Sequence, residues 1–157
     1  MGAVYFYHLT RKPLEATLPL LLGKALGAGW RCLVVGPDAA RLNTLDQQLW
    51  QGHDEEFLAH GLAGGAHDAE QPILLSPEHT ASNRAQCAMC IDGAAVTPEQ
   101  VRSYERTCIL FDGNDESATQ GARVQWKSLT DAGCAAQYWS EESGNWQMKA
   151  KKDESTE

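Results

Sequence analysis

The chain has 157 residues, of which 43% are hydrophobic and 22% are charged, and its formal net charge is −8. These values are typical of one globular domain with a single core. No apolar run approaches the length of about 18 residues that spans a membrane. The opening residues also lack the basic-then-apolar order of a signal peptide, so we expect a cytoplasmic protein.

The negative charge is concentrated in one part of the chain. Residues 37–78 contain eight acidic residues and a single basic residue, Arg41, whereas the remaining residues contain 13 acidic and 12 basic groups. A solvated acidic surface is the ordinary interpretation of such a cluster. Strong binding to a phosphate backbone needs clustered lysine and arginine, so we expect no strong direct binding to nucleic acid.

The first half of the chain alternates between strand and helix patterns. The runs of apolar residues and their spacing predict a strand, a helix, a buried strand and a second helix, at Val4–Leu9, Leu14–Ala28, Trp30–Val35 and Asp38–Trp50. Thr10 and Asp38 are the candidate caps of the two helices. This order is typical of α/β units built on a parallel sheet.

The second half continues the same pattern with longer connections. Strands are predicted at Pro72–Leu75, Cys87–Ile91, Thr107–Phe111 and Ala135–Ser140, and helices at a short segment beginning with Thr97 and at residues 115–131. We expect loops at 61–71 and 76–86. The sequence therefore predicts a single three-layer α/β domain over residues 1–148, with a mostly parallel sheet, followed by a frayed or disordered polar tail at 149–157.

The sequence offers no recognisable catalytic motif. The loop His8–Pro13 after the first strand has no glycine, so it cannot wrap a phosphate as a P-loop does. Asp92 and Asp112 both follow strands and could lie close together, but no acid, base or metal partner accompanies them. We therefore expect a non-catalytic domain, without a cofactor, in a fold that enzymes often use. The alternative is a nucleotide-binding enzyme with a degenerate loop.

The five cysteines include one CxxC motif, Cys87-Ala-Met-Cys90. A redox CxxC is expected at the N-terminus of a helix, and a zinc site needs two further ligands. Here the flanking residues are apolar and resemble a buried strand. We expect core cysteines and no metal site, with a metal or redox protein as a third interpretation.

Several segments, taken in order and spacing, resemble the chi subunit of bacterial DNA polymerase III. The resemblance extends over roughly residues 4–150, and its most specific part is LDQQLW followed by FLAHG and the QPILL strand. It implies a non-catalytic replication accessory subunit associated with the clamp loader. It also implies a mononucleotide-binding-like α/β fold without a phosphate loop. A subunit of this family binds the psi subunit of the clamp loader and the acidic C-terminal tail of the single-stranded-DNA-binding protein (SSB).

The resemblance also implies which residues contact the first of these partners. In the chi family, the aromatic residues in LDxxLW and FLxHG belong to the psi-binding face, and they correspond to Trp50 and Phe57 here. Large aromatic side chains suit a protein interface because they bury much area at low entropic cost. A tryptophan at the end of a helix could equally close the core, and this alternative stays open.

A second set of candidate residues lies in the segment Arg123-Val-Gln-Trp126-Lys127. On a helix, Arg123 and Lys127 share a face and Trp126 lies alongside, which suits a ligand with a carboxylate and an apolar group. The resemblance implies that this ligand is the SSB tail. Some relatives carry lysine where this chain has Thr119. An exposed amphipathic helix with ordinary surface charges is the alternative.

Overall fold

The computed structural model describes residues 2–50, 60–80 and 82–153. Within these ranges the helices are α1, α2, α3 and α4, at Leu14–Gly27, Ala39–Trp50, Pro98–Ser103 and Glu116–Asp131, with a short 3-10 helix at Asp68–Glu70. The strands β1 to β8 lie at Ala3–Leu9, Cys32–Val35, Gly61–Leu62, Ile73–Ser76, Cys87–Cys90, Arg106–Asp112, Ala135–Ser140 and Gln147–Lys152.

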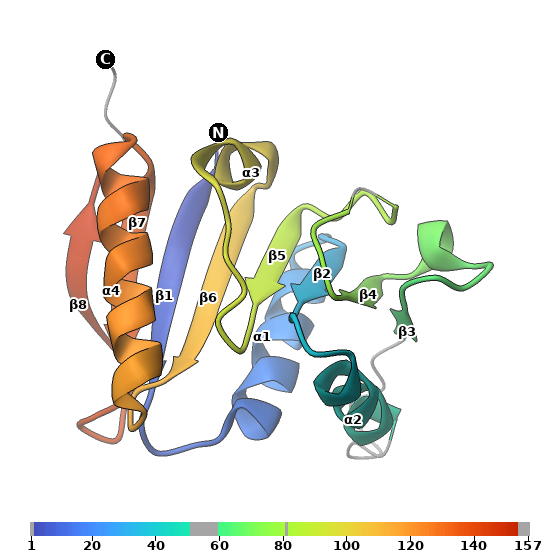
Figure 1. The fold of residues 1–157 in the computed structure, drawn as a ribbon, viewed down its shortest axis with the longest axis horizontal. Coiled ribbons are helices and arrows are strands. Elements are labelled where there is room, and N and C mark those ends of the chain that lie inside the picture. The colour runs from blue at the N-terminus through green and yellow to red at the C-terminus, as the bar shows by residue number, and fades with distance from the viewer. Residues whose placement is uncertain (1, 51–59, 81, 154–157) are drawn as a thin grey trace.

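The strands form one sheet in the order β3-β4-β2-β5-β6-β1-β7-β8 (Figure 1). Every pairing is parallel except that of β7 with β8, which is antiparallel. The predicted α/β class with a mostly parallel sheet is confirmed.

Helices cover both faces of this sheet. Apolar residues of α1 and α2 pack with one side of the strands in one core cluster, which contains Leu18, Leu22, Leu42 and Leu45. The opposite cluster contains Val101 of α3 and Ala122 and Leu129 of α4. Figure 1 shows α4 crossing in front of the sheet and α1 behind it. The predicted three layers are therefore present.

Two of the helix starts follow directly from side-chain caps. Asp38 accepts a hydrogen bond from the backbone N–H of Ala40 at 3.0 Å, as its predicted role requires. Thr97 and Gln100 form a reciprocal capping box at the start of α3. The prediction for Thr10 is wrong, because α1 begins after Pro13 and has no side-chain cap.

The structure adds two strands that the sequence analysis placed in loops or in the tail. Gly61–Leu62 forms the short strand β3 beside β4, inside the expected loop 61–71. Gln147–Lys152 forms β8 on the outer edge of β7, so residues 149–152 continue the sheet and are not frayed. Lysines suit an edge strand because their charge discourages pairing with another chain.

Candidate partner-binding site

Helix α4 presents the predicted cations at the surface. Its first turn is fixed by Asp115, whose Oδ1 accepts hydrogen bonds from the backbone N–H groups of Ser117 and Ala118. Ala122 and Leu129 are buried against the sheet, so the opposite side of the helix faces solvent. Arg123 and Lys127 lie on this exposed side, as their spacing predicts.

Trp126 is half-buried and connects α4 with the sheet. Its ring centroid lies 5.4 Å from that of Phe6 in an edge contact and 6.1 Å from that of Tyr138 on β7. Most of the indole therefore packs on the core, and Tyr138 extends the aromatic surface beside it. We call Arg123, Trp126, Lys127 and Tyr138 the α4–β7 face.

The two cations of the α4–β7 face differ in their surroundings. The Lys127 ammonium lies 3.1 Å from the Asp131 carboxylate, one turn later on the helix. Arg123 makes no ion pair with any residue that the structure describes. Burial raises the pKa of the Tyr138 phenol, and the positive charge of Arg123 partly opposes this rise. Arg123 is therefore the more available anion ligand.

Two residues near these cations were not predicted from the sequence. Tyr138 comes into contact with Trp126 only through the pairing of β1 with β7. Val124 is an apolar side chain with 68% of its surface exposed. The alternation in the predicted strand 135–140 could have placed Tyr138 on a sheet face, but not the helix that covers it.

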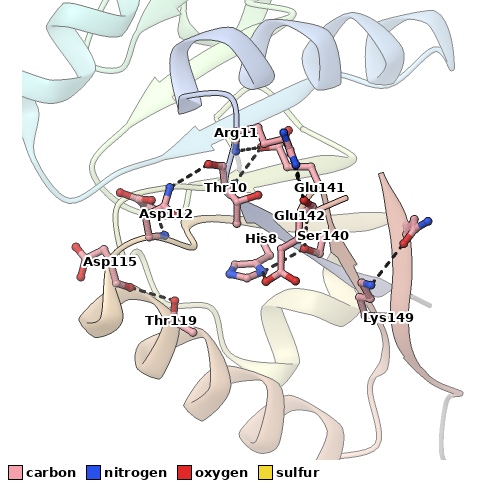
Figure 2. Close-up of polar contacts among 12 residues, drawn as sticks. His8, Thr10, Arg11, Asp112, Asp115, Thr119, Ser140, Glu141, Glu142 and Lys149 are labelled. Atoms are coloured by element: carbon pink, nitrogen blue, oxygen red, sulfur yellow. Dashed lines mark hydrogen bonds and ion pairs between the residues drawn. The ribbon is translucent and has the colours of Figure 1, made fainter. Parts of the chain in front are cut away.

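His8 lies beside this face, in a group that superficially resembles a catalytic triad (Figure 2). Its Nδ1 atom is 3.3 Å from Ser140 Oγ and 3.7 Å from Glu142 Oε1. Both contacts are made to the same ring nitrogen, whereas a triad needs the serine on one nitrogen and the acid on the other. Ser140 is also almost fully buried. The arrangement is consistent with a structural role.

A cleft of about 1070 Å³ opens on the other side of α4, at the carboxyl ends of β1, β5 and β6. Strands β1 and β6 are neighbours, and their following helices cover opposite faces, so this is a topological switch point of the kind that binds nucleotides. Arg123, Trp126 and Lys127 do not line this cleft. It is therefore a separate feature from the α4–β7 face.

The two aspartates considered as a catalytic pair both line this cleft. Asp92 accepts a hydrogen bond from Arg41 Nε at 3.1 Å, and Asp112 accepts one from the backbone N–H of Asn114 at 2.9 Å. Each carboxylate is engaged with its own partner, and no contact between the two is recorded among the residues described. Their contacts give no support to acid–base catalysis.

A buried carboxylate holds the loop after β1. Glu141 is 3% exposed, and its Oε2 atom accepts hydrogen bonds from the backbone N–H groups of Thr10, Arg11 and Lys12, each at 3.1 Å. Figure 2 shows Glu141 beside Thr10 and Arg11. The loop therefore has no phosphate-binding glycines, but its backbone amides bind the carboxylate of Glu141.

The CxxC motif lies inside strand β5. Cys87 and Cys90 are buried in the two different core clusters, since residues three apart in a strand point to opposite faces. Burial raises the pKa of Cys90 to about 12, so its thiol stays protonated at neutral pH. Among the described residues, no group of three or more His, Cys, Asp or Glu side chains could hold a metal ion.

Comparison with known protein families gives one match. A family model described as DNA polymerase III chi subunit, HolC, matches residues 1–137. The chain belongs to the chi family. The resemblance inferred from the sequence is thereby confirmed, and the chain is a replication accessory subunit of DNA polymerase III. A search of curated proteins finds no match.

The expected psi-binding residues of this chi-family chain lie within or next to residues 51–59, which the structure does not describe. Trp50 is the last residue of α2, while its side chain and the whole of Phe57 lie outside the described residues. The histidine of the FLAHG motif, His60, is buried, and its Nε2 lies 3.0 Å from the backbone oxygen of Asp46 in α2. The assignment of Trp50 and Phe57 stays a prediction.

No helix within the described ranges of this chain is long and apolar enough to cross a membrane.

Proposed function

We propose that this chi-family chain is a non-catalytic cytoplasmic adapter of the clamp loader. It joins the polymerase, through psi, to the C-terminal tail of SSB, and it uses a separate surface for each partner. The observation that carries this proposal is the family match over residues 1–137.

The α4–β7 face is the proposed receptor for the SSB tail. The exposed guanidinium of Arg123 has no competing carboxylate among its described neighbours, so it is available to hold a terminal carboxylate in a two-pronged hydrogen bond. Trp126 and Tyr138 offer an apolar surface beside it. Thr119 contributes no charge, and its hydroxyl donates to the backbone oxygen of Asp115.

Replacing the arginine tests this receptor. Arg123→Ala should weaken binding of a fluorescent SSB-tail peptide at least several-fold, because a hydrogen bond to a charged group contributes about 1.5–3 kcal/mol. Fluorescence anisotropy at fixed ionic strength measures the loss. Lys24→Ala removes one exposed positive charge from α1 and is the matched control. Equal losses in the two variants would reduce the effect to net charge and refute the site.

The segment around Trp50 and Phe57 is the proposed psi-binding face. Trp50→Ala and Phe57→Ala should each weaken the complex with psi and leave binding of the SSB-tail peptide unchanged, since aromatic anchors contribute strongly to interfaces. Gel filtration and calorimetry with psi measure the loss. Circular dichroism is the necessary control. Unfolding of both variants would assign these residues to the core and contradict the interface.

The alternative function, a nucleotide-binding enzyme, has one feature in its favour, the cleft at the switch point. A nucleotide that binds there should raise the melting temperature with its concentration. The adapter proposal expects no such rise, and it also expects little binding of free single-stranded DNA at low salt. A saturable rise with nucleotide would favour the alternative.

A further inference from the structure

The loop between β1 and α1 directs three consecutive backbone N–H groups at one point. Thr10, Arg11 and Lys12 all donate to the same oxygen atom, Oε2 of Glu141, at 3.1 Å. Successive amides that converge in this way form a concavity that binds anions. A residue about 130 positions away supplies the anion here, so the contact is a product of the tertiary fold.

The position of this loop corresponds to the phosphate site of nucleotide-binding folds. It follows the carboxyl end of β1 and precedes the first residue of α1, Leu14, and its residues also line the cleft at the switch point. In dinucleotide-binding folds, the turn between the first strand and the first helix holds the phosphates. This chain reaches a similar anion site without glycine.

The carboxylate in this site is buried and has no cationic partner in the described structure. Glu141 is 3% exposed, and no ion pair to it occurs among residues 2–50, 60–80 and 82–153. A buried charge without compensation is strongly unfavourable. The three amides are therefore the groups that make its burial tolerable, as expected for a site built for an anion.

We propose that residues 10–12 form an oxyanion-binding site that Glu141 occupies from within the same chain. The ligand class is a small oxyanion, either a carboxylate or a phosphate. In the natural chain the side chain of Glu141 fills the site, so these three amides are not available to an external anion. This inference concerns a different surface from the partner-binding faces and does not depend on them.

The test removes the internal anion and supplies an external one. Glu141→Ala deletes a CH₂–COO⁻ fragment whose nearest free equivalent is acetate. The unfolding of the full chain is measured with acetate, phosphate or chloride at equal ionic strength. Acetate or phosphate should stabilise this variant saturably, and a concentration ten times the dissociation constant should raise the folding equilibrium constant about eleven-fold. The two oxyanions together show which ligand geometry the amides accept.

The natural chain and Glu142→Ala are the matched controls. Glu142 neighbours Glu141, but its side chain is 60% exposed and contacts His8 rather than the loop. Neither control should respond to oxyanions more than to chloride. If Glu141→Ala is unfolded in chloride, acetate or phosphate should restore its circular dichroism. The proposal is wrong if no oxyanion stabilises or refolds this variant, or if both controls respond equally.

Discussion

Cys90 shows how burial alone can change the chemistry of a residue that looks reactive in the sequence. Its side chain is 1% exposed, and burial raises its pKa from 9.0 to about 12. The negative charge of a thiolate is poorly solvated in the core, so the protonated form is favoured there. This residue therefore makes stability dependent on alkaline pH.

The dependence has a definite sign. Between pH 9 and 12 the unfolded thiol has lost its proton while the folded thiol keeps it, so the free energy of unfolding should fall as the pH rises. One proton corresponds to about 1.4 kcal/mol per pH unit. Cys90→Ala should flatten this slope by up to that amount in urea titrations across the window. An unchanged slope would show that Cys90 does not titrate on unfolding.

For single residues, exposure on a helix could be predicted from the sequence, whereas tertiary contacts could not. The exposure of Arg123 and Lys127 follows from helical spacing and was predictable. The edge contact of Trp126 with Phe6 depends on how α4 lies across β1, which no local pattern contains. Glu141 reads as an ordinary surface acid, and its burial becomes visible only when the loop 10–12 folds back onto it.

Helix α3 has only six residues, so its ends matter for its stability. The Thr97 hydroxyl accepts from the N–H of Gln100 at 3.1 Å, and the Gln100 side chain accepts from the N–H of Thr97 at 2.9 Å. Val101 is fully buried against the core. The capping box therefore fixes the start of a helix that packs against β1.

Removing this cap should cost about 1 kcal/mol. Thr97→Ala loses the hydroxyl acceptor, whereas Thr97→Ser keeps it and should be close to the natural chain. Chemical denaturation of the two variants measures the difference. Equal stability of the alanine and serine variants would mean that the hydroxyl does not cap α3 in solution.

At the scale of elements, the pattern of apolar residues predicted the buried strands but did not predict the edge strands β3 and β8. Strands β2, β4 and β5 are continuous buried runs, which a parallel sheet covered on both faces requires. Strand β8 has the sequence QMKAKK and is exposed along its whole length. Such a segment becomes a strand because β7 offers an open edge, so composition alone could not reveal it.

At the scale of the molecule, the helix that ends at Trp50 and the α4–β7 face lie far apart in the sheet order. Helix α2 packs against β3 and β4 at one edge, whereas the α4–β7 face lies over β1 and β7 near the other edge. The two helices also cover opposite faces of the sheet (Figure 1). A partner bound beyond α2 should therefore leave the α4–β7 face free.

Simultaneous binding is the most direct test of the adapter account. The SSB-tail peptide is titrated by calorimetry into the chain alone and into its preformed complex with psi. The account predicts one peptide per chain in both titrations, with dissociation constants that agree within about twofold, because uncoupled distant sites act independently. Loss of peptide binding in the presence of psi, or no peptide binding in either titration, would contradict it.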